Sequence, residues 1–131
     1  MALKNLFGKS EKLTPERKKA LVEFCRNLNI RFQNLELLDL AFYHRSFANE
    51  SSESKHGNNE RLEFLGDSVL GFISAEYFYH YLSHLPEGEM TKKRAACVCE
   101  KSLYGFAKEI DLGKYILLGK GEERTGGRGR A

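Results

Sequence analysis

The strongest constraint on the fold is a stretch from about Asn59 to Ser83 in which apolar residues recur at helical spacing. Positions three and four apart share one face of an α-helix, so Glu60, Glu63 and Asp67 form one acidic row on it. Most other positions in the first half of this helix are apolar: Leu62, Phe64, Leu65, Val69, Leu70, Phe72 and Ile73. A helix that is apolar on most sides is typically buried. The sequence therefore predicts a long, buried central helix with an acidic row.

The rest of the chain also has helical rather than strand-like spacing. The pattern predicts further helices at Thr14–Asn29, Asn34–Ser46 and Glu89–Glu109, and a polar loop at Asn49–Asn58. The first helix has Thr14 as a candidate N-cap and Pro15 in its first turn. Its predicted buried stripe consists of Leu21, Phe24, Cys25 and Leu28. After Asp111 the chain is rich in glycine, which predicts a short turn of helix and then an exposed, mobile tail. From Gly119 onward we expect this tail to be disordered or to fold back non-natively. The fold class is therefore all-α.

The acidic row is where the sequence places chemistry. Glu63 and Asp67 lie one turn apart, near enough to act on the same ion or water. Carboxylates in an apolar setting repel one another and lose solvation, and a divalent cation relieves both problems. Hard oxygen ligands suit Mg²⁺ or Mn²⁺. The alternative from spacing alone is that the row is the solvated face of an amphipathic helix, paired with Arg61 and nearby lysines.

Two features of the same helix predict contact with another helix or subunit. Gly66 lies inside the helix, where it costs about 1 kcal/mol relative to alanine, so we expect it to allow close approach of another backbone. The aromatic run Tyr77, Phe78, Tyr79 and Tyr81 exceeds what one helix face can bury, so part of it is expected to meet a partner subunit.

Length and composition fit one ordinary domain. The chain has 131 residues and a formal net charge of +3, which permits a polyanionic partner without requiring one. The N-terminus lacks the apolar core of a signal peptide, and the three cysteines are an odd number, so we expect free thiols and a cytoplasmic protein without a membrane span. The basic residues gather in two places, at Lys92, Lys93 and Arg94, and at Arg124, Arg128 and Arg130.

The central stretch resembles the signature of the ribonuclease III family. The matching residues are Asn59-Glu60-Arg61-Leu62-Glu63-Phe64-Leu65-Gly66-Asp67-Ser68-Val69-Leu70. Other segments resemble the family in the same order: His44-Arg45-Ser46, Glu87-Gly88-Glu89, Arg94-Ala95, Gly119-Lys120-Gly121-Glu122 and Gly126-Gly127. The resemblance extends from about residue 15 to residue 130.

The resemblance implies an all-helical endonuclease domain that forms a homodimer and cleaves double-stranded RNA in RNA processing, including rRNA maturation. It implies Mg²⁺ as cofactor, with Mn²⁺ as a substitute, and products with 5′-phosphate and 3′-hydroxyl ends. By motif position, Glu63 and Asp67 are the catalytic and metal-binding residues, while Glu60 and Glu122 are accessory. Candidate RNA phosphate contacts are Lys92, Lys93, Arg94, Arg128 and Arg130.

The sequence also departs from the family pattern. Family members carry a second acidic pair, an Asp and a Glu three residues later, after the glycine-rich loop, and this chain ends at Ala131 before it. We therefore divide the chain into an N-terminal extension, residues 1–13, and an incomplete nuclease domain, residues 14–131, with little activity expected from this chain alone. The alternative is a non-catalytic module of the same ancestry that binds RNA or a protein. A helical di-metal carboxylate protein is disfavoured, since the chain lacks its repeated Glu-x-x-His pairs.

Overall fold

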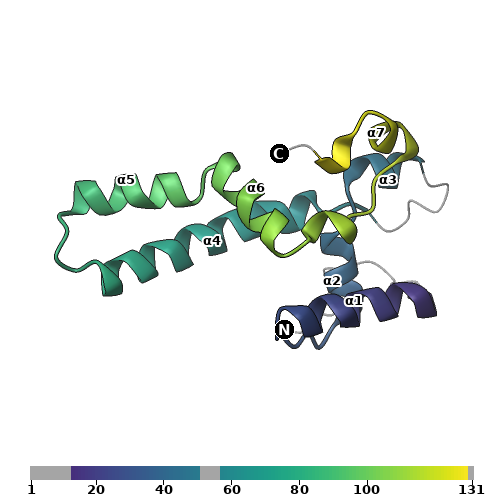
Figure 1. The fold of residues 1–131 in the computed structure, drawn as a ribbon, viewed down its shortest axis with the longest axis horizontal. Helices are drawn as coiled ribbons and strands as arrows, with labels where there is room; N and C mark the ends of the chain where they lie inside the picture. Colours follow the sequence, from purple (N-terminus) through teal and green to yellow (C-terminus); the bar gives the residue numbers. More distant parts are fainter. Residues whose placement is uncertain (1–12, 51–56, 130–131) are drawn as a thin grey trace. The chain divides into compact units, whose positions relative to one another are not determined.

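The computed structural model describes residues 13–50 and 57–129, and the chain divides into two compact units (Figure 1). The first unit contains the described residues up to Glu60 and those from Leu112 onward, and the second contains Arg61 to Asp111. Helices of the first unit are α1 (Pro15–Asn27), α2 (Leu35–Ala41), α3 (Arg45–Glu50) and α7 (Lys120–Arg124), with short 3-10 turns η3 (Leu112–Lys114) and η4 (Gly127–Gly129). Helices of the second unit are α4 (Glu60–Tyr81), which begins at the last residue of the first, α5 (Glu87–Cys97) and α6 (Glu100–Glu109).

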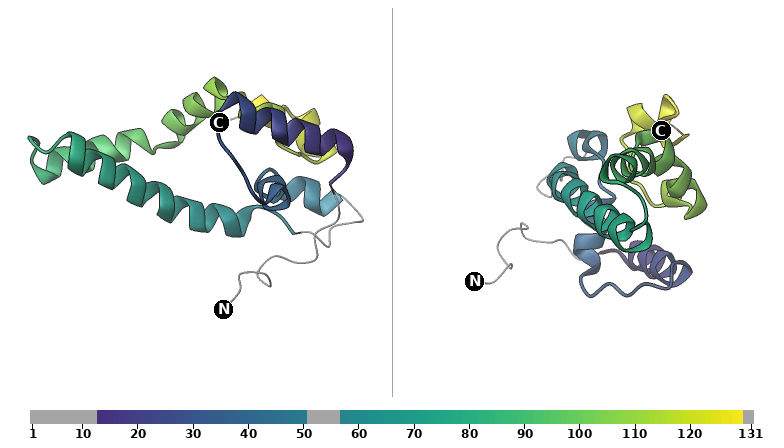
Figure 2. Two further views of the ribbon diagram at one scale, coloured as in Figure 1. Left: turned by 90° about the horizontal axis from the view of Figure 1, so that it is seen from below. Right: turned by 90° about the vertical axis from the view of Figure 1, so that its left-hand side faces the viewer.

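The predicted all-α class is confirmed. The only strand-like pairing among the described residues is an isolated parallel bridge between Tyr43 and Leu117. Figure 2 shows α4 as one uninterrupted helix, with α5 and α6 following as two shorter ones. Within the described ranges, none of the helices is both long and apolar enough to cross a membrane.

The first unit is built around an aromatic core. Leu21, Phe24 and Cys25 of α1 are buried together with Leu38, Phe42 and Tyr115, and Leu28 packs against this core. The Phe24 ring meets the rings of Phe42 and Tyr115 edge-on, at centroid distances of 5.2 and 4.9 Å. Such pairs add about 0.5–1.5 kcal/mol each beyond their buried area. The stripe predicted on the first helix is confirmed, as is its cap, since Thr14 Oγ1 accepts the Arg17 N–H at 3.2 Å.

A largely buried ion pair joins α1 to α2. Arg17 Nε donates to Asp39 Oδ1 at 2.6 Å, and the two side chains are 17% and 7% exposed. The Arg17 guanidinium also lies 5.6 Å from the centre of the Phe42 ring. Breaking such a pair leaves an uncompensated charge in a poorly solvated place, so the pair constrains how α2 packs on α1.

The single helix predicted at Asn34–Ser46 is wrong, because the chain forms two helices there. Asn34 caps α2 by accepting the Leu37 N–H at 3.0 Å, and α2 ends at Ala41. The Phe42 carbonyl then accepts the Leu117 N–H at 2.9 Å, and the His44 N–H donates to the Leu117 carbonyl at 3.1 Å. These bonds take backbone groups that a continuous helix would use, so the helix breaks and α3 starts at Arg45.

The helix predicted at Glu89–Glu109 is also interrupted. α5 ends at Cys97, and Cys99 adopts an extended conformation as the N-cap of α6. Ser102 Oγ donates to the Ala96 carbonyl at 2.7 Å, which satisfies an acceptor at the end of α5. All three cysteines are free, as predicted. The Cys99 pKa is lowered by hydrogen bonds from the Ser102 hydroxyl and from backbone N–H groups.

The mobile tail predicted from Gly119 onward is wrong for residues 119–129. This segment forms α7 and η4, and α7 packs on α3. The sequence pattern missed this packing because the glycines suggested a flexible segment, whereas Gly119 and Gly121 are bound by Ser46 and Glu50, about 70 residues earlier in the chain. The predicted loop at Asn49–Asn58 begins later than expected, because α3 extends to Glu50; residues 51–56 lie outside the described ranges.

The prediction that the central helix is buried on most sides is wrong for this chain. Ser74 is the only buried residue of α4, while Phe64 is 81% exposed and Phe72 72% exposed. An apolar helix surface indicates that another element packs on it, but it does not identify that element. In the second unit, a cavity of about 440 Å³ separates part of α4 from α5, and Phe72, Phe78, Met90 and Arg94 are among its lining residues.

Candidate active site

The paired carboxylates Glu63 and Asp67 lie on the N-terminal half of α4. Both side chains are exposed, and no hydrogen bond or ion pair to either is found in the part of the chain that the structure describes. The pairing with Arg61 that a purely structural surface would offer is therefore not formed. The two acidic groups are one turn apart, so their charges face the same region of solvent.

Glu60 has a different environment at the start of α4. Its carboxylate accepts a hydrogen bond from Asn58 Nδ2 at 3.0 Å, and its backbone N–H donates to Asn58 Oδ1 at 3.0 Å. Arg45 Nη1 lies 3.9 Å from Glu60 Oε1, an exposed ion pair that contributes little stability. These contacts favour a role for Glu60 in forming the start of the helix.

The predicted basic cluster lies on α5. Lys92, Lys93 and Arg94 are all exposed, which is compatible with contact to a polyanion. Lys92 Nζ lies 3.1 Å from Glu89 Oε1, while Arg94 borders the cavity between α4 and α5. The role of these side chains as phosphate contacts remains a prediction.

Glu122, the accessory residue implied by the resemblance, is half-buried on α7 in the first unit. Its side chain lies directly over Gly127. A Cβ atom at Gly127 would collide with Glu122 Oε1 and would lie 2.6 Å from Glu122 Cγ. The glycine therefore makes room for the Glu122 side chain.

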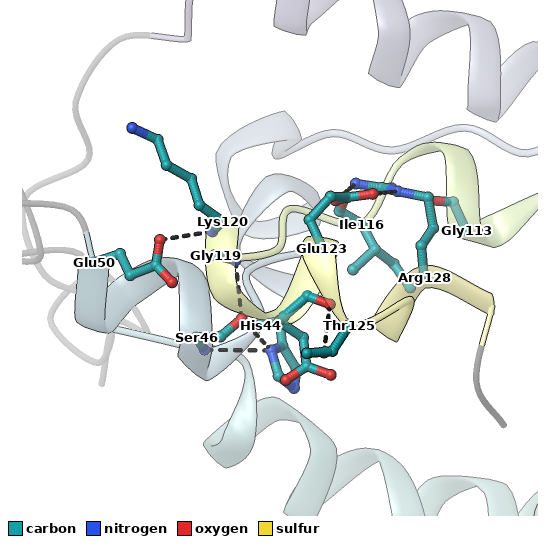
Figure 3. A network of polar contacts seen from close by, with 11 residues as sticks. His44, Ser46, Glu50, Gly113, Ile116, Gly119, Lys120, Glu123, Thr125 and Arg128 are labelled. Atoms are coloured by element: carbon teal, nitrogen blue, oxygen red, sulfur yellow. Dashed lines mark hydrogen bonds and ion pairs between the residues drawn. The ribbon is translucent and has the colours of Figure 1, made fainter.

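The start of α7 is held by a carboxylate from another helix. Figure 3 shows Glu50, the last residue of α3, beside the backbone of Lys120. Its Oε2 atom accepts the Lys120 N–H at 2.6 Å, and its Oε1 atom accepts the Gly121 N–H at 3.0 Å. These two bonds lower the Glu50 pKa, the Gly121 bond contributing most. The sequence pattern does not indicate this role of Glu50, because the residue falls in a stretch that looks like a loop.

His44 and Ser46 complete the contact between α3 and this segment. Ser46 Oγ accepts the Gly119 N–H at 2.9 Å and lies 2.7 Å from His44 Nδ1 (Figure 3). The Ser46 N–H also donates to His44 Nδ1 at 3.2 Å. The His-x-Ser spacing of the sequence is thus used to hold Gly119.

Arg128 is engaged within the first unit. Its Nε and Nη2 atoms bind the two oxygens of Glu123 at 2.8 and 2.6 Å, and its Nη1 atom donates to the carbonyls of Ile116, at 2.8 Å, and of Gly113. A guanidinium has five N–H groups, so these four bonds leave little capacity for an RNA phosphate. The geometry favours a structural role, and RNA contact by Arg128 remains a prediction. Arg130 lies outside the described residues.

Glu63 and Asp67 supply some of the oxygen ligands that a divalent ion requires. Mg²⁺ is commonly held by one or two carboxylates, with water and substrate phosphate filling the other positions. Glu63 and Asp67 fit one side of such a site. No group of three or more acidic, histidine or cysteine side chains that could hold a metal is found among residues 13–50 and 57–129. The described residues therefore offer a pair of ligands rather than a closed cage.

The fold and this pair define an all-helical protein that presents two carboxylates to a cation or to water. A family model for ribonuclease-III-like domains matches residues 34–131. Ribonuclease 3 of Treponema denticola is 50% identical over 116 residues, which cover 88% of this chain and 47% of that protein. Ribonuclease 3 of Oceanobacillus iheyensis is 53% identical over 104 residues, which cover 79% and 46%.

Solved structures give the same result. A crystal structure of the nuclease domain of ribonuclease III from Campylobacter jejuni has a TM-score of 0.74 at 38% identity, covering 86% of this chain and 72% of that one. A second structure of that domain has a TM-score of 0.73 at 39% identity, covers 82% and 71%, and describes flexibility in a region involved in its dimer formation. The chain belongs to the ribonuclease-III-like family. It spans about half the length of the curated relatives it matches.

Proposed function

We propose that this chain is part of an endoribonuclease that cleaves double-stranded RNA by divalent-metal-dependent hydrolysis, with rRNA precursors among its substrates in the cytoplasm. The observation that carries the proposal is that Glu63 and Asp67 on α4 are exposed and have no ion-pair partner within residues 13–50 and 57–129, in the region matched by the family. An exposed carboxylate pair without a cationic partner is available to an added cation.

Glu63 and Asp67 would hold Mg²⁺ or Mn²⁺ from one side. The bound ion would supply an activated water and stabilise the leaving oxygen. Through that ion the two side chains would orient the scissile phosphate. Water would add to the phosphorus atom and the bond from phosphorus to O3′ would break, which leaves a 5′-phosphate and, after O3′ takes up a proton, a 3′-hydroxyl. The exposed Lys92, Lys93 and Arg94 would contact phosphates of the A-form duplex, whose shape rather than sequence is recognised.

The test is cleavage of a defined RNA duplex by a chain extended through the acidic pair expected beyond residue 131. We expect cleavage to require Mg²⁺ or Mn²⁺ and to be abolished by EDTA. Glu63→Ala and Asp67→Ala should each remove most activity with the melting temperature unchanged. Glu76→Ala is the matched control, because Glu76 is an exposed carboxylate on the same helix whose ion pair among the described residues is with His80, at 3.5 Å. Cleavage that survives EDTA would refute the metal mechanism.

A second function is favoured by one observation. Since the described residues hold no complete metal cage, the chain could serve as a non-catalytic module that binds RNA or a protein. An extended chain that binds the duplex but cleaves nothing in either metal would establish this alternative.

We also propose that the protein forms a homodimer through α4. Its exposed apolar residues, with Phe64 and Phe72 the most exposed, leave a surface unfavourable in water. Apart from the neighbouring residues and backbone of α4 itself, no described atom lies within 4 Å of a Cβ added at Gly66, so this face is open to another helix. Light scattering that reports a monomer at tens of micromolar would count against the dimer.

A further inference from the structure

Residues 119–129, which form α7 and η4, bring no apolar side chain into the first unit. Their sequence is Gly-Lys-Gly-Glu-Glu-Arg-Thr-Gly-Gly-Arg-Gly, without an aliphatic or aromatic residue. The aromatic core of the unit includes Tyr115, and Ile116 packs against it, so both residues precede this segment. Burial of apolar surface is the dominant force that holds most folded segments in place. It contributes little to the attachment of residues 119–129.

Two side chains of α3 hold the start of the segment (Figure 3). Ser46 Oγ accepts the Gly119 N–H at 2.9 Å, and the Glu50 carboxylate accepts the next two N–H groups at 2.6 and 3.0 Å. The first N–H groups of a helix have no partner inside it, and the N-cap of α7 is a glycine, so these side chains supply the acceptors. Lys120 and Arg124 of α7 also favour the charged form of Glu50.

Arg128 holds the other end of the segment. Its Nε and Nη2 atoms bind the Glu123 carboxylate, and its Nη1 atom donates to the carbonyls of Gly113 and Ile116. These two carbonyls lie before the segment in the sequence, so Arg128 ties η4 and α7 back to the chain that leads into them. The attachment at this end is again polar.

The backbone just before the segment is held separately. The Leu117 N–H donates to the Phe42 carbonyl at 2.9 Å, and the Leu117 carbonyl accepts the His44 N–H at 3.1 Å. Neither bond uses an atom of residues 119–129, so both can persist when the segment leaves α3. The boundary between the two parts therefore lies between Leu117 and Gly119.

We propose that residues 119–129 form a polar latch, a segment that detaches from α3 and closes again as one unit while the core of the first unit stays folded. Glu50 and Arg128 set how often the latch opens, because each fastens one end. Local opening of this kind is expected where a segment makes few apolar contacts and depends on exposed hydrogen bonds. Protonation of Glu50 promotes opening, because a neutral carboxyl group accepts hydrogen bonds less strongly than a carboxylate. Opening involves the first unit alone and is independent of the proposed nuclease function.

Hydrogen exchange at single amides of the full chain, measured by NMR, tests the latch. The Gly119, Lys120 and Gly121 amides should exchange faster than those of Phe24 and Leu117. Low concentrations of urea should accelerate exchange at Phe24, which requires unfolding of the core. The same urea should leave exchange at Lys120 almost unchanged, because opening the latch exposes little surface.

Two variants test whether the segment opens as one unit. Glu50→Gln removes the charge but keeps one carbonyl acceptor, and it should speed exchange at Lys120 and Gly121 roughly 10-fold. Arg128→Gln should also speed exchange at these two amides, although the bonds of Arg128 described above reach neither of them. Glu36→Gln, which neutralises an exposed carboxylate of α2, is the control and should leave these rates unchanged.

A pH series tests the role of the Glu50 charge. Below pH 4.5, the ordinary pKa of a glutamate, the Lys120 amide of the wild type should lose protection relative to an unstructured peptide, and Glu50→Gln should lose much less. Equal loss in the two chains would contradict this role.

Three other results would overturn the latch. If the Lys120 and Phe24 amides share one urea dependence, the segment opens only with the whole chain. If Arg128→Gln leaves exchange at Lys120 unchanged, the two ends open separately. If Lys120 of the wild type exchanges as fast as in an unstructured peptide, the polar contacts do not hold the segment. The urea series needs only the wild type, so it decides the matter even where a variant does not fold.

Discussion

Replacing Gly119 by alanine tests the contact between α3 and α7 with a single methyl group. The added Cβ would lie 2.6 Å from the Ser46 carbonyl oxygen and from Glu50 Oε1. The Ser46 carbonyl belongs to the backbone of α3 and cannot move cheaply. Glu50 could rotate away, but only by giving up its bonds to the Lys120 and Gly121 amides.

The expected change in the free energy of unfolding of Gly119→Ala is the balance of two opposing effects. Overpacking of this kind costs about 1–3 kcal/mol. Alanine also restricts the unfolded chain, which stabilises the folded state by about 0.4–1 kcal/mol where the backbone is permissive. Gly119 has φ −66° and ψ 155°, a conformation that alanine adopts without strain, so this opposing term applies in full. We therefore expect a net loss of about 1–2 kcal/mol, a fall in melting temperature of roughly 4–8 °C for a chain of this size.

Gly121→Ala is the matched control. Its Cβ would approach only Glu50 Oε1, at 3.3 Å, and alanine is favoured inside a helix by up to about 1 kcal/mol. This variant should be as stable as the wild type or slightly more stable. Thermal and urea melts of the wild type, Gly119→Ala and Gly121→Ala give the free energy of unfolding of each chain. Both substitutions restrict the unfolded chain to a similar extent, so this effect largely cancels when the two variants are compared. Equal stability of Gly119→Ala and Gly121→Ala would refute the steric reasoning.

Three further predictions concern other parts of the chain. Lys114 lowers the pKa of Glu23, the Gly121 and Lys120 amides lower that of Glu50, and Arg128 lowers that of Glu123. These three carboxylates therefore stabilise the folded chain above the ordinary pKa of 4.5, and this stabilisation is lost as the pH falls below it. Melts across roughly pH 3–7 should show the loss, with a flatter curve for Glu50→Gln. Asp39→Ala should destabilise the first unit by about 3–5 kcal/mol in urea melts, because it leaves Arg17 unpaired. Gly66→Ala should stabilise α4 of an isolated chain by about 1 kcal/mol yet weaken self-association in sedimentation, if another helix packs there.

Local signals in the sequence were sufficient for much of the first unit. The Thr14 cap and the stripe through Leu21 and Phe24 each depend on residues close in the chain, and both are confirmed. The acidic row was found for the same reason, since its spacing is a property of one helix. The cap, the buried stripe and the acidic row are thus all features that residues close together in the sequence determine.

Features that depend on distant segments could not be read from the pattern. The helix break after Ala41 arises from backbone bonds to Leu117, and the order of residues 119–129 arises from Glu50 and Arg128. In each case the chain looked locally like a longer helix or a flexible tail. A hydrogen bond across about 70 residues leaves no periodic trace in the sequence, so only the folded arrangement reveals it.

The exposure of α4 leads to a last prediction: burying the apolar residues of this helix under another element should change how strongly Glu63 and Asp67 bind a metal ion. Two like charges one turn apart, about 6 Å, repel by roughly 0.7 kcal/mol in water and by roughly 3 kcal/mol at an effective dielectric near 20. Covering the apolar residues around Glu63 and Asp67 would therefore raise the cost of holding both charges without a cation. If a second copy of the chain supplies the cover, Mn²⁺ affinity measured by electron paramagnetic resonance should rise with protein concentration, in step with dimer formation. Phe64→Glu, which places a charge on the most exposed apolar side chain of the helix, should remove this dependence. If the Mn²⁺ affinity stays constant while the dimer forms, then burial of α4 in the dimer does not affect metal binding.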